Sequence, residues 1–241
     1  MITKSQIKLI NSLKQKKFRQ QYGLFVAEGV KTISELLESS LKLHALFTTK
    51  SFNIDAKDET VISEKDLKRI SFLKTPNTAL AVFEIPNEQP VNNKGLILIL
   101  DAVSDPGNLG TIIRLCDWFG IKDLVCSNHT VDCFNPKVVQ ATMGSITRVN
   151  IIYVDLKVFL NTYDGSVFGA FMDGKNVYSS NLPKRGALVM GNEANGISKE
   201  IEAIVTERLA IPRFGDLQAA ESLNVATATA ILLSEFKRGS C

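Results

Sequence analysis

Residues 95–116 have the sequence GLILILDAVSDPGNLGTIIRLC, and this stretch indicates how the chain folds. It begins with a nearly continuous apolar run over residues 95–103, which is typical of a strand buried on both faces of a sheet. Pro106 and Gly107 predict a turn, and a helix is expected over residues 108–119. A buried strand that leads into a helix predicts an α/β fold with a mostly parallel sheet.

The rest of the C-terminal half continues this alternation of apolar strands and amphipathic helices. Short apolar runs predict strands over residues 123–127, 149–154, 167–172, 187–190 and 208–211. Helical spacing, with a proline or a polar capping residue at the start, predicts helices over residues 136–143, 198–205 and 224–237. These elements extend the predicted parallel sheet to the end of the chain.

The N-terminal part predicts a smaller α/β unit of its own. A basic helix is expected over residues 4–13, strands over residues 24–28, 43–48 and 80–85, and helices over residues 30–37 and 63–70. The stretch PNEQPVNNK that follows has two prolines and three asparagines and is typical of a linker. We therefore expect a small domain over residues 1–86, a linker over 87–94 and a larger domain over 95–241.

Composition excludes several classes of protein. Apolar residues make up 45% of the chain and charged residues 22%, which is ordinary for a globular protein. The start of the chain lacks the apolar core of a signal peptide, so we expect a cytoplasmic protein. The four cysteines form no C-x-x-C pair, and only two histidines are present. A zinc site or a histidine-based catalytic triad is therefore not expected, and no metal is predicted.

Charge is distributed unevenly along the chain, although the net charge is only +3. Residues 1–86 contain 14 Lys and Arg against 9 Asp and Glu, whereas residues 87–241 contain 14 against 16. The first 20 residues have no acidic side chain and six basic ones: Lys4, Lys8, Lys14, Lys16, Lys17 and Arg19. Such a cluster attracts a polyanion such as a nucleic acid, and a solvated chain end is the open alternative.

The first candidate motif is N-x-G-x-x-x-R, formed by Asn108, Gly110 and Arg114. In parallel α/β sheets ligands bind at the carboxyl ends of strands, where a helix N-terminus offers N–H groups to an anion. Arg114 lies among apolar residues, so we expect its guanidinium to need a partner. That partner is either a phosphate or reacting hydroxyl, or a structural salt bridge with Asp117.

The second and third candidate motifs also follow predicted strands. Gly191–Gly196 has the pattern G-x-E-x-x-G, in which the Glu193 carboxylate can accept hydrogen bonds and glycine lets a ligand approach the backbone. This pattern also occurs in purely structural turns. After Ile211 and Pro212, the run from Ser222 to Val225 reads SLNV and opens a long helix. A capping role explains Ser222 or Asn224 but not both.

Taken together, the three motifs resemble those of the SpoU/TrmH family of RNA ribose 2′-O-methyltransferases. The resemblance covers residues 95–241, and the segment GLFVAEGVK at residues 23–31 is similar to the ribosomal-protein-like substrate-binding domain found in many members. It implies an α/β fold with a deep C-terminal trefoil knot, a homodimer, and S-adenosylmethionine (AdoMet) as cofactor. The absence of G-x-G-x-x-G after any strand and of a phosphate-binding G-x-x-x-x-G-K-[ST] loop disfavours other nucleotide-binding classes.

The resemblance also implies roles for individual residues. Arg114 matches the essential arginine of the family, and its other polar active-site positions fall on Asn108, Glu193, Ser222 and Asn224. The cofactor-contact positions fall on Gly191, Asn192, Ile211 and Leu223. Because guanidinium loses its proton only above pH ~12, we expect Arg114 to hold a phosphate and stabilise the developing alkoxide rather than act as a base. We expect Glu193 to orient Arg114 or Asn108.

The substrate implied by the two-domain layout is ribosomal RNA, with guanosine favoured and transfer RNA next. Lys16, Lys17 and Arg19 are the predicted RNA contacts. Two departures from the family pattern are the longer loop from Asp216 to Glu221 and Ala226 where many members have serine. The alternatives are an RNA-binding or ribosome-assembly protein without catalysis, and a small-molecule α/β enzyme.

Overall fold

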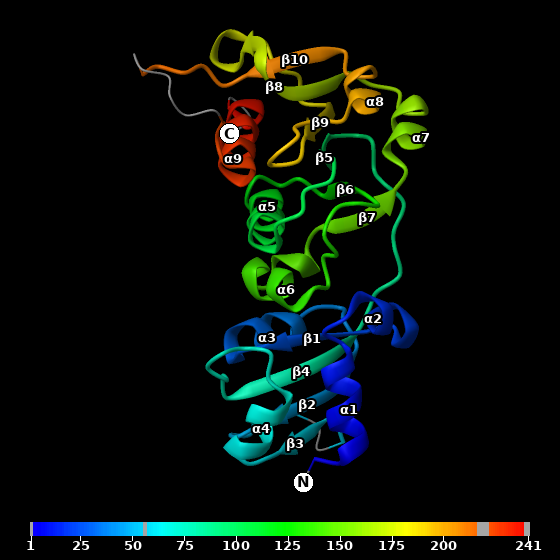
Figure 1. Ribbon diagram of the computed structural model, residues 1–241, viewed down its shortest axis with the longest axis vertical. Helices are drawn as coiled ribbons and strands as arrows, with labels where there is room; N and C mark the ends of the chain where they lie inside the picture. The colour runs from blue at the N-terminus through cyan, green and yellow to red at the C-terminus, as the bar shows by residue number, and fades with distance from the viewer. Residues whose placement is uncertain (1, 55–56, 216–221, 239–241) are drawn as a thin grey trace. The chain divides into compact units, whose positions relative to one another are not determined.

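The computed structural model describes residues 2–54, 57–215 and 222–238, and its chain divides into two compact units (Figure 1). The first unit comprises Met1–Asn87 with Asp132–Thr147, and the second comprises Glu88–Val131 with Arg148–Cys241. By its contacts, the segment Asp132–Thr147 thus belongs with the N-terminal residues, although the sequence places it in the second half. The domain boundaries expected from the sequence stay a prediction.

The first unit is a four-stranded sheet with helices packed on it. Its strands are β1 (Leu24–Glu28), β2 (Leu43–Thr48), β3 (Glu59–Val61) and β4 (Ala79–Glu84), in the order β1-β4-β2-β3. Only β2 and β3 run parallel. Its helices are α1 (Lys4–Ser12), α2 (Lys16–Tyr22), α3 (Val30–Leu37), α4 (Glu64–Ile70) and α6 (Pro136–Thr142), followed by the 3-10 turn η1 (Ser145–Thr147). These elements form an α/β unit that includes α6 and η1, which lie outside the residues 1–86 expected for the small domain.

Local sequence explains most of these elements. Thr3 begins α1 with a capping box shared with Gln6, and Ser63 accepts a hydrogen bond from the Asp66 N–H at the start of α4. Strand β1 is buried at all five positions and β4 at five of its six, so both strands belong to the core of this unit. Helix α2 and strand β3 were not predicted, because neither segment has an apolar repeat.

The second unit contains a six-stranded, fully parallel sheet, which confirms the predicted α/β class. Its strands are β5 (Leu96–Leu100), β6 (Asp123–Ser127), β7 (Asn150–Val154), β8 (Val167–Asn176), β9 (Gly186–Met190) and β10 (Glu207–Ala210). Their order is β10-β8-β9-β5-β6-β7. The helices are α5 (Pro106–Trp118), α7 (Leu156–Asn161), α8 (Lys199–Glu202) and α9 (Val225–Lys237), with the 3-10 turn η2 (Val177–Ser179). Helix α7 was not predicted.

The centre of this sheet positions the polar loops described below. Strands β5, β6 and β9 are buried at every position, and the burial of β5 confirms the prediction made from the apolar run at residues 95–103. Helices α5 and α9 pack against each other, as Figure 1 shows. Helix α5 begins at Pro106, two residues before the predicted start, because the Asp105 carboxylate caps it by accepting from the Asn108 N–H at 2.8 Å.

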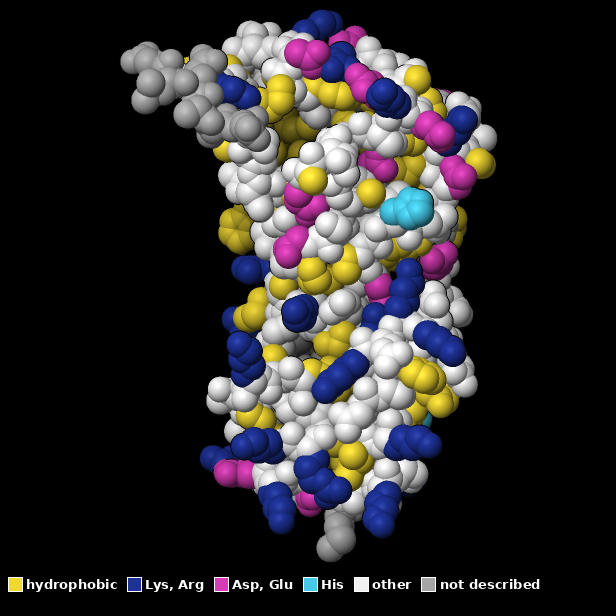
Figure 2. All heavy atoms as spheres, in the orientation of Figure 1, with side chains coloured by type: hydrophobic (Ala, Val, Ile, Leu, Met, Phe, Trp, Pro, Cys, Tyr) yellow, Lys and Arg dark blue, Asp and Glu magenta, His cyan; other side chains and the backbone are white. Residues whose placement is uncertain are grey.

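The surface of the first unit carries many basic side chains on the face shown in Figure 2. Within the described residues of this unit, exposed lysines lie on or next to α1, α2, α4 and α6, among them Lys8, Lys14, Lys16, Lys17, Lys68, Lys74 and Lys137. This agrees with the uneven charge of the sequence. In the part of the chain that the structure describes, no helix is long and apolar enough to cross a membrane.

Candidate active site

Three loops meet around the carboxyl edge of the second unit's sheet. One follows β5 and leads into α5, another follows β9 at residues 191–197, and the third is the segment 222–224 before α9. Because parallel strands end at the same edge, polar residues that follow them are brought together. The second and third candidate motifs have residues in these loops, and the first lies in α5, starting in its first turn.

The Glu193 carboxylate joins the loop after β9 to the start of α5. Its Oε1 atom accepts hydrogen bonds from Asn108 Nδ2 at 2.9 Å and from the Asp105 N–H at 3.4 Å. Its Oε2 atom accepts from the N–H of Ser104 at 3.3 Å and from the Ser104 hydroxyl at 3.4 Å. Asn108, one of the two partners expected for Glu193, is thus hydrogen-bonded to it.

Asn224 connects the third motif to the first. Its Nδ2 atom donates to Asn108 Oδ1 at 2.9 Å, while its own Oδ1 accepts from the N–H groups of Ala226 and Thr227 at 2.9 and 3.2 Å. The side chain therefore caps α9 and also holds Asn108. We call Glu193, Asn108 and Asn224 the polar triad, since one continuous line of hydrogen bonds joins all three motifs.

The pKa of Glu193 is held below its ordinary value. Partial burial alone would raise it, but hydrogen bonds donated by Asn108 and by backbone N–H groups, including those of Ser104 and Asp105, outweigh that effect. The carboxylate is therefore ionised at neutral pH and acts only as an acceptor. This fixes the amide of Asn108 with its nitrogen toward Glu193 and its oxygen toward Asn224.

Arg114 lies on the exposed side of α5, and this corrects our interpretation of its apolar sequence neighbours. Ile112, Ile113 and Cys116 are buried on the opposite side of the helix. Among the described residues, Arg114 makes no hydrogen bond or ion pair. The alternative of a structural salt bridge with Asp117 is wrong for this structure, because Asp117 pairs with Arg148 at 2.9 Å.

The loop after β5 is held in an unusual conformation by two side chains. Ala102 has a φ of 59°, in the left-handed region of backbone conformation that residues other than glycine rarely adopt. Its N–H donates to Ser127 Oγ at 2.9 Å, and its carbonyl accepts from Asn192 Nδ2 at 2.7 Å. The Asn192 oxygen accepts from the N–H groups of Ala194 and Asn195. Asn192 therefore ties the loop after β9 to the loop after β5.

Gly191 is required by the packing of its own loop. A Cβ atom at this position would lie 2.2 Å from the carbonyl carbon of Gly196, far inside contact distance. The N–H of Asn192 donates to the Gly196 carbonyl and the N–H of Gly196 to the Asn192 carbonyl, both at 2.9 Å. The structural explanation left open for the glycines therefore holds for Gly191, whatever else the loop binds.

The predicted cofactor positions fit a ligand that is held through backbone groups. Gly191 directly follows β9 and Ile211 directly follows β10, while Leu223 lies beside Asn224 of the polar triad. Within the described residues, the main-chain N–H and C=O groups of Gly191, Ile211 and Leu223 form no hydrogen bond. Such unpaired groups at the carboxyl edge of a parallel sheet can bind the polar atoms of a cofactor.

Two further predictions concern residues around this edge. Ser222 is exposed and makes no hydrogen bond among the residues that the structure describes, so the structure does not join it to the polar triad. The longer loop from Asp216 to Glu221 lies outside the described residues.

The predicted RNA contacts in the first unit divide into two groups. Lys16 and Lys17 are exposed on α2, as a phosphate contact requires. Arg19 is only 2% exposed, and its guanidinium donates to the Asp132 carboxylate and to the carbonyls of Leu13 and Lys14. The prediction that Arg19 contacts RNA is therefore corrected: its donors are used inside the fold.

Sequence reasoning missed two residues that support the site. The Asp101 carboxylate, directly after β5, accepts from the N–H of Ser198 at 2.8 Å, and Ser127 at the end of β6 holds Ala102. The available signal was their position, because polar residues at the carboxyl ends of buried parallel strands border the ligand edge. Both connect loops that are far apart in the sequence.

Comparison with known proteins identifies the family. The model of the SpoU rRNA methylase family matches residues 95–234, and that of the MRM3-like substrate-binding domain matches residues 4–81. The 23S rRNA (guanosine(2553)-2′-O)-methyltransferase RlmP of Bacillus subtilis is 30% identical over 231 residues, covering 92% of this chain and 91% of its own.

Solved structures agree over nearly the whole chain. A TrmH-family protein of Porphyromonas gingivalis is 40% identical with a TM-score of 0.89, covering 99% of both chains. An AdoMet-bound rRNA methyltransferase of Sinorhizobium meliloti is 30% identical with a TM-score of 0.88, covering 99% of this chain and 96% of its own. The motifs, the parallel sheet and these matches agree, and the chain belongs to the SpoU rRNA methylase family.

Proposed function

We propose that this protein transfers a methyl group from AdoMet to a ribose 2′-hydroxyl of ribosomal RNA, at a guanosine. The observation that carries the proposal is the polar triad, in which Glu193, Asn108 and Asn224 join all three family motifs at the ligand edge of the sheet. The RlmP relative, named for guanosine 2′-O-methylation of 23S rRNA, supports the substrate. The AdoMet-bound structure from Sinorhizobium meliloti supports the cofactor.

Bound AdoMet supplies an activated methyl group, so the protein itself has to orient the acceptor hydroxyl and stabilise charge as the proton leaves. The exposed guanidinium of Arg114 holds the RNA phosphate and stabilises the developing alkoxide. The polar triad keeps the start of α5 and the start of α9 in fixed positions. Backbone groups of Gly191, Ile211 and Leu223 bind the cofactor, while the side chain of Asn192 supports the loop that presents them.

We also propose that the protein acts as a homodimer through the outer side of α5. Trp118 follows Arg114 by one helical turn and is 85% exposed, which is unusual for so large an apolar side chain. A second copy packed on this side would cover Trp118 and would bring Arg114 to the interface. Sedimentation analysis tests this proposal: Trp118→Lys should yield a folded monomer, and an unchanged dimer would contradict it.

Two further expectations from the sequence analysis remain proposals. A C-terminal trefoil knot would suit a chain in which α9, after the last strand β10, returns to pack against α5 near the sheet centre. The location in the cytoplasm stays a prediction.

The test of the proposed function is methylation of ribosomal RNA that lacks the modification. Purified protein, AdoMet with a labelled methyl group, and RNA from a strain without this gene should give 2′-O-methylguanosine after nuclease digestion and mass spectrometry. Label in a base, or label only in transfer RNA, would contradict the proposal. Absence of label in every RNA would favour the alternative of an RNA-binding protein without catalysis.

A further inference from the structure

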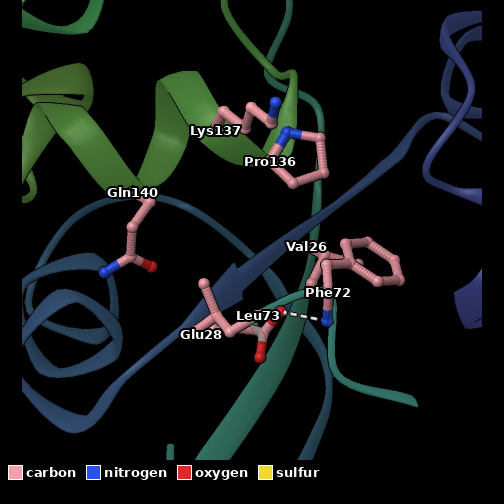
Figure 3. A pocket seen from close by; sticks show the side chains of 7 residues that line it. All are labelled: Val26, Glu28, Phe72, Leu73, Pro136, Lys137 and Gln140. Carbon is pink, nitrogen blue, oxygen red and sulfur yellow. Dashed lines mark hydrogen bonds between the residues drawn. The ribbon is translucent and has the colours of Figure 1, made fainter. Parts of the chain in front are cut away.

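The first unit contains a cavity that the proposed methyl transfer does not use. It has a volume of about 200 Å³ and lies between α6 on one side and β1 with the segment after α4 on the other (Figure 3). Sites for drug-sized ligands usually measure about 300–1,000 Å³, so this space suits a single ring system rather than a whole cofactor.

The floor of the cavity includes a buried carboxylate. Glu28 is only 5% exposed, and its Oε1 and Oε2 atoms accept from the Phe72 N–H at 2.7 Å and the Ser71 hydroxyl at 2.6 Å. Burial raises the pKa of Glu28, while these two bonds and the charge of Lys14 oppose that effect. A carboxylate has about four acceptor positions, so each oxygen can accept one further hydrogen bond.

The walls are largely apolar and the rim is basic. Val26, Phe72, Leu73 and Pro136 line the space, and Figure 3 shows Gln140 and Lys137 on the opposite side from Glu28. The Lys14 ammonium lies 4.8 Å from the centre of the Phe72 ring. Lys14 and Lys137 are exposed, so a ligand that carries phosphates would meet positive charge at the entrance.

We propose that this cavity binds an unpaired guanine base of the RNA. Proteins recognise single-stranded RNA by placing bases against aromatic and apolar side chains and bonding their Watson–Crick edges. Guanine presents two neighbouring donors on that edge, the ring N1–H and the exocyclic amino group, which match the two carboxylate oxygens of Glu28. Adenine and cytosine present one amino group there, and uracil one N–H between two carbonyls that a carboxylate repels.

The inference rests on the proposed function in one respect, since it takes RNA to be the substrate. The sequence of this unit, at residues 4–81, matches a substrate-binding domain model, and that match supports RNA as the occupant. The cavity would select a guanine at a position distinct from the polar triad. It therefore gives the first unit a role in sequence recognition beyond attraction of phosphates by surface lysines.

The experiment measures binding of fluorescein-labelled, uridine-rich RNA oligonucleotides to the full chain by anisotropy. The oligonucleotides carry a central guanine, inosine, adenine or uridine. Guanine should bind about 5- to 150-fold more tightly than uridine, the range of one good bidentate contact. Inosine, which lacks the exocyclic amino group, should lose most of this preference. Equal affinity for all four oligonucleotides would overturn the proposal.

Variants locate the preference. Glu28→Gln should abolish the difference between guanine and inosine, and a folded Glu28→Gln protein that keeps this difference would overturn the proposal. Because Glu28 also bonds to the Phe72 N–H, its replacement could disturb the fold. Gln140→Ala is therefore a second variant, since the Gln140 side chain lines the cavity and makes no hydrogen bond within the described residues. It should reduce guanine affinity, and unchanged affinity would count against the cavity.

A charge control completes the test. Lys137→Ala should weaken all oligonucleotides and guanine most, whereas Lys68→Ala removes the same charge from α4, outside the cavity, and should weaken all of them alike. If Lys137→Ala and Lys68→Ala changed the preference for guanine equally, this would contradict a role of Lys137 in binding at the cavity. Methyl transfer is assayed in parallel. A protein that transfers no methyl group but still prefers guanine would refute only the proposed function. A protein that transfers methyl groups but does not prefer guanine would refute only the proposal for the cavity.

Discussion

Two arginines, one in each unit, have surroundings opposite to those that their sequence neighbours suggest. Arg19 belongs to a basic, polar segment that favours exposure, yet it is 2% exposed and bonded to Asp132. Arg114 belongs to an apolar segment that favours burial, yet it is exposed and has no partner among the described residues. Arg19 is therefore a structural residue, and Arg114 is available to a ligand or a partner subunit.

The difference shows that the burial of a helical residue depends on the side of the helix on which it lies, rather than on the average polarity of its sequence neighbours. Along α5 the buried apolar side chains of Leu109, Ile112, Ile113 and Cys116 follow helical spacing, and residue 114 falls outside that stripe. Along α2 the only fully buried residue is the arginine itself, because a carboxylate 113 positions later in the chain pairs with it. Variants of the two arginines test this contrast.

The largest effect is expected on stability, from Arg19→Ala. The change leaves the mostly buried Asp132 without its cation, and breaking a buried pair on one side lowers the free energy of unfolding by about 3–5 kcal/mol. Urea denaturation measures it, with Lys17→Ala on the same helix as the exposed control. The double variant Arg19→Met with Asp132→Leu should recover most of the loss. A loss below about 1 kcal/mol would mean that the pair behaves like a surface ion pair.

Arg114→Ala should affect catalysis instead. Removal of one group that stabilises a developing oxyanion typically lowers turnover by about 10²–10³-fold. Because the side chain is exposed, the free energy of unfolding should stay within about 0.5 kcal/mol of the wild type. Arg148→Ala is a matched control, since it removes another exposed arginine near the end of α5. Near-normal methyl transfer by Arg114→Ala would refute its assigned role.

Local pattern was enough to predict much of the fold. The bounds of β1, α3, β2 and β6 agree with those expected from apolar spacing and flanking polar residues. The parallel sheet of the second unit was likewise predicted from buried strands that alternate with helices. Helix α2 was missed because it has no apolar repeat, and its one buried residue, Arg19, pairs with a distant carboxylate that no local pattern contains.

The residues of the candidate site were predicted from the sequence, but the hydrogen bonds between them were not. The positions of Asn108, Glu193 and Asn224 after strands indicated the correct edge of the sheet. The hydrogen bonds between them span 85 and 116 residues of sequence, and their pairing depends on how the loops cross that edge. Sequence alone therefore left Glu193 with two possible partners, and the structure selected Asn108 over Arg114.

A double-mutant cycle sharpens that selection. Asn108→Ala and Glu193→Gln should be coupled by about 0.5–3 kcal/mol in unfolding free energy, the range for residues in one hydrogen-bond network. Arg114→Ala and Glu193→Gln should be additive within about 0.3–0.5 kcal/mol, because no hydrogen bond or ion pair in the described residues joins them. Strong coupling between Arg114 and Glu193 would show that the arginine has an internal partner after all.

The lowered pKa of Glu193 predicts a smaller, pH-dependent effect. A carboxyl group whose pKa is lower in the folded state stabilises the fold above its unfolded pKa, and this contribution is lost as pH falls through the folded value. The wild type should therefore lose stability below the ordinary glutamate range relative to Glu193→Gln. Thermal denaturation measured from neutral to acid pH tests this. Parallel curves for the two proteins would contradict the shift.

The smallest effect concerns the lysines that, unlike Arg19, remain exposed on α2. If Lys16 and Lys17 each contact a phosphate, their joint replacement by alanine should flatten the logarithmic salt dependence of RNA binding by about 0.7 per contact on single-stranded RNA. The stability-corrected Arg19→Met, Asp132→Leu protein should keep the wild-type slope, because the buried guanidinium neutralises no phosphate. A slope that changes with Arg19 rather than with the lysines would reverse the assignment of structural and binding residues on this helix.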